Sequence, residues 1–380
     1  MASRLYRTTR LLYEYVDAVL RGLGLPALGT PTWAMLLAWA VTGLILLDAR
    51  PLPTRVARWL PGRGHDALNR LYRCMPWSSR ALTGLWIASA KRLGEVGYLV
   101  LDDVIVEKAF AQRLRWAGWT YSFAKKRKVY GLHIVVLLWC AGSWRIPVGY
   151  RLWRPKRSCS PRRYRTKLEL ALELVQAVVA ARLPVRYLVG DTVYTAGWFT
   201  KRLARLGLTW QGTLSPQTVV VWRGRRSAVR DLAVRLKLKW RDPLGLRATA
   251  LTVYAPKYGT LRLVVTRNRH GNCEYVVSNA LDADLTTLVV RKRSRWSVET
   301  VFRDTKQFAG LSACQCWVDQ AMVRHVGIVL LTFVVLQRLR IAPDESVAAV
   351  KERWQLAALQ NGEAPPTPLR ACPRELRVTA

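Results

Sequence analysis

The chain has 380 residues, and its 61 Lys and Arg outnumber its 24 Asp and Glu, which gives a formal net charge of +37. Hydrophobic residues make up 51% of the chain, so it has ample material for a core, and this excludes a disordered basic tail. A folded protein tolerates such self-repulsion when a polyanion neutralises it, and nucleic acid is the commonest polyanion. We therefore expect a folded protein that binds nucleic acid.

Two apolar stretches test the alternative of a membrane protein. Residues 33–47 (WAMLLAWAVTGLILL) and 325–337 (HVGIVLLTFVVLQ) are both shorter than the roughly 20 residues that a bilayer span needs. The N-terminal MASRLYRTTRLLYEYV carries charge but no apolar run followed by a cleavage site. We expect no membrane partner and a cytoplasmic location.

Seven cysteines are scattered along the chain without a paired framework. The one close pair, Cys314 and Cys316, has His325 downstream, but this set falls short of the four ligands of a zinc site. We expect reduced, structural thiols and no metal at this place.

Residues 1–95 are predicted to form an N-terminal helical DNA-binding domain. In residues 4–24 (RLYRTTRLLYEYVDAVLRGLG), apolar side chains recur at spacings of three and four, while Arg occupies the other face. Gly22, Gly24 and Pro26 are expected to end this helix.

Strands are predicted from residue 98 onward. The runs 98–106 (YLVLDDVIV), 129–139 (VYGLHIVVLLW) and 144–153 (WRIPVGYRLW) indicate an antiparallel meander. An amphipathic helix over 165–183 and a short strand over 185–191 follow. Three strands, a crossover helix and a fourth strand is the order of a ribonuclease H-like α/β core.

The segment 208–287 is predicted to be a β-strand insertion, because β-type runs replace the helical pattern and PKYGT (256–260) indicates a hairpin turn. A helical pattern returns at 290–307. The catalytic domain is therefore expected to combine 96–207 with 288–342. Residues 343–380, which contain GEAPPTP, are expected to be a loosely packed C-terminal tail.

Acidic residues interrupt two of the predicted strands. Asp102 and Asp103 are adjacent, so their side chains face opposite ways, and a buried carboxylate is costly unless a cation or hydrogen bonds compensate it. A strand-end acid paired with Lys or Arg is the ordinary explanation. Asp191 ends the strand 185–191, where ligands of open α/β sheets gather, although it could equally cap the following helix.

Glu299 lies among cations in residues 295–306 (RWSVETVFRDTK). Arg295 and Lys306 share one helical stripe with it, which taken alone is typical of a solvated face with an Arg295–Glu299 ion pair. Together with the two strand acids, however, Glu299 completes a set of three carboxylates in a very basic chain. Such a set can hold two divalent ions, about 3.5 to 4 Å apart, for phosphodiester chemistry.

Basic runs flank the proposed active strands. They are KKRK (Lys125, Lys126, Arg127 and Lys128) and residues 154–167, RPKRSCSPRRYRTK. We expect loops that follow a DNA backbone, with ordinary solvated loops as the alternative.

Residues 295–306 resemble the third-carboxylate signature of DDE transposases from bacterial insertion sequences. The resemblance is to the insertion-sequence-four-like branch, marked by Tyr, two residues, Arg, three residues, Glu, six residues, Lys. Arg295, Glu299 and Lys306 match that spacing, whereas Lys292 stands where the family has Tyr. GDTVYT, around Asp191, is similar to the family's second-acid strand. For the first acid the family pattern favours Asp102, with Asp103 as the competing choice.

This resemblance covers about residues 98–340 and implies a DNA transposase of the bacterial cytoplasm, associated with the nucleoid. A homodimer would bind terminal inverted repeats and target DNA, cleave the element ends and transfer strands. Two Mg²⁺ ions, for which Mn²⁺ could substitute, would be held by Asp102, Asp191 and Glu299, with Lys292, Arg295 and Lys306 on the DNA. The alternatives are a catalytically inactive, domesticated DNA-binding protein and a ribonuclease H-like nuclease without strand transfer.

Overall fold

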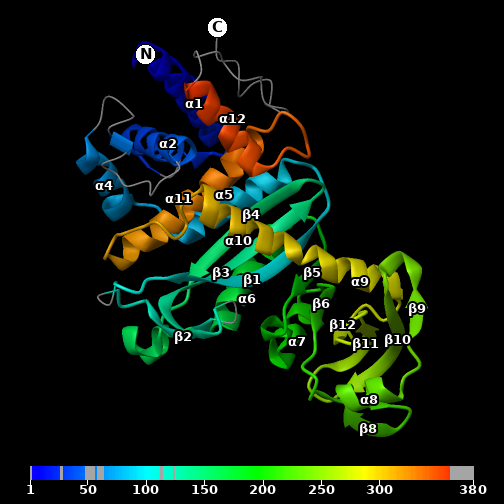
Figure 1. Ribbon diagram of the computed structural model, residues 1–380. Coiled ribbons are helices and arrows are strands. Elements are labelled where there is room, and N and C mark those ends of the chain that lie inside the picture. The colour runs from blue at the N-terminus through cyan, green and yellow to red at the C-terminus, as the bar shows by residue number, and fades with distance from the viewer. Residues whose placement is uncertain are drawn as a thin grey trace.

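A twelve-stranded mixed sheet runs through the computed structural model, which describes residues 2–25, 29–47, 56–57, 64–111, 114–122 and 125–359 (Figure 1). The strand order is β2-β3-β1-β5-β6-β12-β11-β10-β7-β8, with β4 paired to β3 and β9 paired to β10. The strands are β1 (Gly97–Glu107), β2 (Gly118–Ser122), β3 (Arg127–Ala141), β4 (Trp144–Leu152), β5 (Val185–Gly190), β6 (Trp210–Thr213), β7 (Val219–Trp222), β8 (Arg225–Ala228), β9 (Lys239–Arg241), β10 (Leu246–Ala255), β11 (Gly259–Arg267) and β12 (Cys273–Ser278).

Helices cover both faces of this sheet and extend beyond one end of it. They are α1 (Ala2–Gly22), α2 (Pro31–Leu46), α4 (His65–Cys74), α5 (Ser79–Lys91), α6 (Lys167–Ala180), α7 (Gly197–Arg205), α8 (Val229–Arg235), α9 (Leu285–Ser294), α10 (Trp296–Phe308), α11 (Asp319–Arg338) and α12 (Val347–Leu359). The chain is thus a mixed α/β protein.

The predicted meander is confirmed, because β1 pairs antiparallel with β3, and β3 pairs antiparallel with β4. The predicted crossover helix is α6, which begins with a capping box between Thr166 and Glu169. It leads to β5, which joins β1 in parallel. The sequence missed β2, a five-residue edge strand whose Trp119 is largely exposed, because so short a strand buries too little to leave an apolar pattern.

The β-rich segment continues the central sheet. The four-residue strand β6 pairs in parallel with β5 and antiparallel with β12, so a single ladder joins the two regions. The predicted hairpin turn is present between β10 and β11. Neither β6 nor the seven-residue helix α8 was predicted, because each is too short to show a period.

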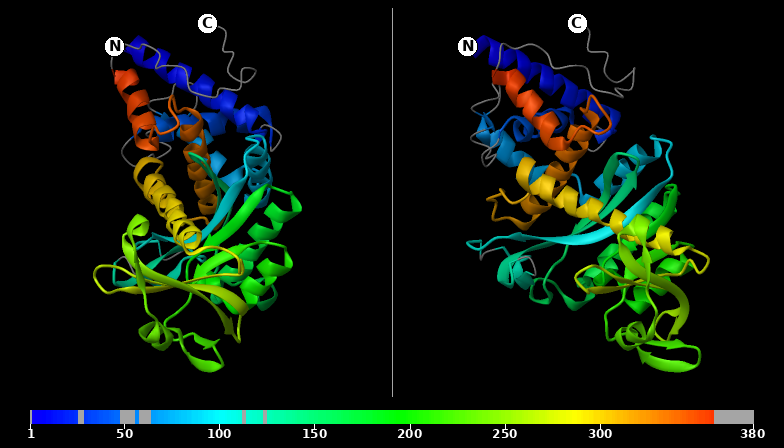
Figure 2. Two further views of the ribbon diagram at one scale, coloured as in Figure 1. Left: turned by 90° about the vertical axis from the view of Figure 1, so that its right-hand side faces the viewer. Right: turned by 45° about the vertical axis from the view of Figure 1, so that its right-hand side comes forward.

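The N-terminal and C-terminal helices pack together at one end of the molecule, and the β-rich segment lies at the other (Figure 2). The expectation of a loosely packed tail is therefore wrong for residues 347–359. They form α12, which packs against α1 and α2, and its Trp354 is fully buried. Its buried side chains recur every three or four residues, a pattern that the proline-rich segment after it had masked. Residues 360–380, like Pro26, lie outside the described residues.

Within the described residues, α11 is the one helix long and apolar enough to cross a membrane. However, 78% of its most apolar window is buried inside the protein, as in the core helix of a folded domain. The other apolar stretch forms α2, which is shorter and contributes nine buried residues to the core.

Candidate active site

The strand register brings Asp102 and Asp191 side by side. In the parallel pair of β1 and β5, Leu101 lies opposite Gly190, and the next residue on each chain is an aspartate. Burial, followed by the neighbouring charge of Asp191, raises the pKa of Asp102 to about 7. Two carboxylates that sit this close in a partly buried place favour a shared cation.

Asp103 faces the opposite side of the sheet from Asp102. It accepts a 2.7 Å hydrogen bond from the Lys167 ammonium of α6 and contacts the ring of His133 at 3.4 Å. Although burial acts to raise the pKa of Asp103, the bonds from His133 and Lys167 hold it below its usual value. The ordinary explanation, an acid compensated by cations, therefore describes Asp103.

Glu299 reaches Asp102 through a shared arginine. Arg295 joins the end of α9 to the start of α10, and its Nη1 donates to Asp102 Oδ2 at 2.9 Å. Its Nη2 pairs with Glu299, one turn further along α10. The predicted pairing on one helical stripe is confirmed, and the side chains of Asp102 and Glu299 are only 15% and 33% exposed.

The turn after β5 fixes Asp191. Its Oδ1 accepts hydrogen bonds from the backbone N–H of Val193 at 2.9 Å and of Tyr194 at 3.2 Å, so this acid also caps the turn, as the sequence allowed. Burial raises the pKa of Asp191. A Cβ at Gly190 would lie 2.8 Å from the Cβ of Tyr194, so this tight turn needs glycine.

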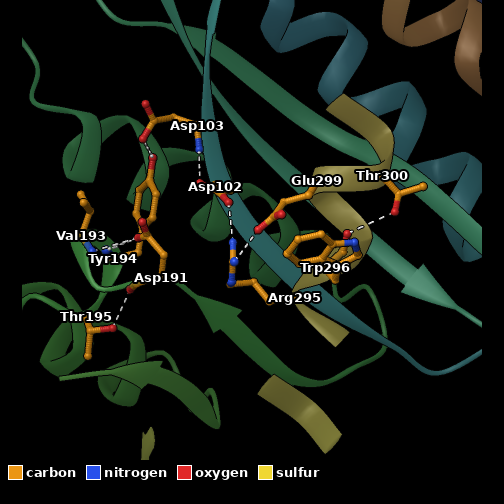
Figure 3. A network of polar contacts seen from close by, with 10 residues as sticks. All are labelled: Asp102, Asp103, Asp191, Val193, Tyr194, Thr195, Arg295, Trp296, Glu299 and Thr300. Atoms are coloured by element: carbon orange, nitrogen blue, oxygen red, sulfur yellow. Dashed lines mark hydrogen bonds and ion pairs between the residues drawn. The ribbon is translucent and has the colours of Figure 1, made fainter. Parts of the chain in front are cut away.

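Tyr194 connects the acids of the two strands, a role that the sequence did not reveal. Its backbone donates to Asp191, and its hydroxyl donates to Asp103 at 3.2 Å (Figure 3). The only signal in the sequence was an aromatic residue three positions after Asp191.

The donor set of Asp102, Asp191 and Glu299 has the oxygen chemistry of a divalent-cation site but not its clustering. Its three side chains offer carboxylate oxygens, the ligands that Mg²⁺ and Mn²⁺ prefer, and two of them are adjacent acids of raised pKa. Within the described residues, no three acidic, His or Cys side chains are clustered as metal ligands, and Arg295 lies between Asp102 and Glu299 (Figure 3). The arginine thus supplies the positive charge at this place.

The proposed DNA-binding cations fall into two groups. Burial, followed by the charge of Lys125, lowers the pKa of Lys306, so the last turn of α10 approaches the KKRK run. Within that run, Lys125 and Arg127 pair with Glu107, while Lys126 and Lys128 are exposed. Lys292 stands apart, because it pairs with Glu274 of β12.

Residues 26–235, more than half of the chain, match the family model described as DDE superfamily endonuclease. The chain belongs to this family of nucleases and transposases that act on DNA. The match covers Asp102 and Asp191 and ends before Glu299. No curated protein matches the chain significantly.

Proposed function

We propose that the protein is a DNA transposase that cleaves the ends of its element and joins them to target DNA. The observation that carries this proposal is the register that sets Asp102 beside Asp191, with Glu299 tied to the same place by Arg295. The order of β4, β3, β1, β5 and β6 supports a ribonuclease H-like core, in which the first three strands are antiparallel and the last two are parallel. The charge of +37 supports DNA as the partner.

Each acid has a distinct support in this proposal. Asp102 is held by β1, Asp191 by two backbone N–H groups and Glu299 by α10, and together they would bind two Mg²⁺ or Mn²⁺ ions. Such ions stabilise the attacking and leaving oxygens of a phosphodiester. Asp103 stays on the other face of the sheet, where Lys167 neutralises it.

Cations around the acids would hold the DNA. Arg295 can offer its planar guanidinium to a phosphate once Asp102 and Glu299 have another cation to bind. Lys306 and the KKRK run would contact the DNA backbone further along the same side of α10, since the charge of Lys125 lowers the pKa of Lys306. A homodimer on paired inverted repeats is the assembly that we propose.

DNA that carries the sequences flanking the coding region, incubated with the full chain and Mg²⁺, tests the function. We expect cleavage at element ends and joining to a second DNA. Glu299→Gln should retain salt-sensitive binding and lose cleavage by about a thousandfold or more. The matched control is Glu352→Gln, whose carboxylate is exposed on α12, away from the acids.

Each alternative function has its own outcome in this assay. Nicked DNA that is never joined would indicate a nuclease without strand transfer. Binding without any cleavage, in wild type and in Glu299→Gln alike, would indicate an inactive DNA-binding descendant and would overturn the proposal.

A further inference from the structure

Two cysteines, Cys314 and Cys316, lie two positions apart in the loop that connects α10 to α11. Their thiols are near enough for each to shift the pKa of the other, and both residues are partly exposed. All six cysteines within the described residues are free thiols. Residues two positions apart have Cα atoms about 5 to 7 Å apart, which overlaps the range of about 4.4 to 6.8 Å that a disulfide accepts.

Positive charge surrounds this pair. The Lys108 side chain, at the end of β1, is buried, and its Nζ donates to the carbonyl oxygens of Cys314 at 2.6 Å and Ser312 at 3.3 Å. The hydrogen bond from Cys314, followed by the charges of Lys108 and Arg73, lowers the pKa of the Cys316 thiol. A thiolate at Cys316 is thus stabilised by the Cys314 thiol and by two nearby cations.

A cavity gives solutes access to the thiols. It has a volume of about 590 Å³, and both cysteines and Lys108 line it. Phe110, which is 99% exposed, and Trp317, which is 58% exposed, also line it, so the cavity reaches the surface. A small-molecule disulfide can therefore approach Cys316 without unfolding of the loop.

We propose that Cys314 and Cys316 form a reversible disulfide by exchange with a small-molecule disulfide such as glutathione disulfide. The Cys316 thiolate attacks one sulfur of the reagent, which forms a mixed disulfide and releases one glutathione thiolate. Cys314 then loses its proton and attacks the sulfur of Cys316, which releases the second glutathione. Two protein thiols are oxidised, and one disulfide is reduced to two thiols.

The site goes beyond the proposed DNA chemistry, but it lies where the acid-bearing elements meet. Lys108 directly follows β1, which carries Asp102, and the loop of Cys314 directly follows α10, which carries Glu299. The Lys108 ammonium therefore links the two elements through the loop that the disulfide would close.

The test uses the reduced full chain, glutathione disulfide, alkylation of remaining thiols and peptide mass spectrometry. We expect Cys314 and Cys316 to become protected from alkylation together, as an internal disulfide, and to be alkylated again after treatment with a reductant. Before oxidation, Cys316 should be alkylated about threefold faster or more than the exposed Cys74 at neutral pH.

Variants separate the two steps. Cys314→Ser should stop at a glutathione adduct on Cys316, whereas Cys316→Ser should leave Cys314 alkylated as in the reduced protein. Cys74→Ser is the matched control and should behave as wild type. Full alkylation of both cysteines after oxidation, or a disulfide from either one to Cys74, would overturn the proposal. Since the readout is the state of the thiols, the result does not depend on DNA cleavage.

Discussion

The guanidinium of Arg295 lies 2.9 Å from the carboxylate of Asp102, although 193 positions separate the two residues. The same guanidinium pairs with Glu299, so a cation of the chain itself bridges two of the three acids. Burial has raised the pKa of Asp102, and this ion pair is one of the contacts that oppose the rise. Any other cation that binds both acids must compete with Arg295.

Removal of the Arg295 guanidinium should both tighten metal binding and weaken catalysis. Without DNA, Arg295→Gln should bind Mn²⁺ about fivefold more tightly, the equivalent of about 1 kcal/mol for one partly exposed ion pair. Cleavage of DNA should nevertheless fall, since the phosphate loses its guanidinium partner. Electron paramagnetic resonance of free Mn²⁺ measures the first effect and a cleavage assay the second.

Arg303→Gln is the matched control for this experiment, because Arg303 lies on the same helix but pairs with Asp304. Its Mn²⁺ affinity should equal that of wild type. Weaker Mn²⁺ binding by Arg295→Gln would show that Arg295 supports the acids and does not compete for them.

The raised pKa of Asp102 predicts a pH dependence of stability. Its ordinary value is 3.8 and its folded value is about 7, so between these values the unfolded chain ionises while the folded chain keeps the proton. The stabilising contribution is therefore complete below about pH 4 and is lost as the pH rises through about 7. Asp102→Asn cannot ionise. Its free energy of unfolding relative to that of wild type should therefore rise by about 1 to 3 kcal/mol from pH 4 to pH 8, reduced by the loss of the ion pair with Arg295.

Urea unfolding at both pH values measures this gain. Addition of Mg²⁺ at pH 8 should stabilise wild type and leave Asp102→Asn unchanged, since only wild type has the first acid. Parallel pH profiles for the two proteins would contradict the raised pKa.

The sequence predicted the long elements, whose apolar pattern extends over many residues, and missed the short ones. The apolar runs of β1, β3 and β4 and the capped helix α6 bury enough side chains to leave a readable pattern. The strand β6 has four residues, and it is a strand only because it pairs with β5 and β12. Its place in the sheet is a tertiary property that no local pattern contains.

The acids were found by their scarcity in a basic chain, but the partners of Asp102 and Asp103 were not. The opposite directions of Asp102 and Asp103 follow from strand geometry, yet which of them would face α10 depends on the packing of α6 and α10 on the two faces. The spacing of Arg295 and Glu299 predicted their pairing. The bond from Arg295 to Asp102 joins distant segments and could be seen only in the folded chain.

The KKRK run should contribute unequally to DNA binding. Lys126 and Lys128 are exposed, so replacement of both by Ala should lower the slope of log affinity against log salt concentration by about 2, or about 1 for each lost phosphate contact. Lys125→Ala should have a smaller effect, because Lys125 pairs with Glu107. Titrations by fluorescence anisotropy at several salt concentrations measure the slopes. Lys91→Ala, on α5, is the control, and an equal slope for all variants would exclude this run from the interface.

A buried lysine in α12 should be essential for the packing of the helical end. Lys351 is 3% exposed, and its ammonium donates to the carbonyl oxygens of Leu44, Leu47 and Phe308, which end α2 and α10. Lys351→Met keeps the aliphatic stem but leaves these acceptors without their donor, so we expect a loss of about 2 to 4 kcal/mol in the free energy of unfolding. Urea unfolding followed by Trp fluorescence measures the loss.

The surface variant Lys201→Met is the control and should stay within about 0.5 kcal/mol of wild type. An equally small change for Lys351→Met would mean that water replaces the ammonium and that α12 is not fixed through these bonds.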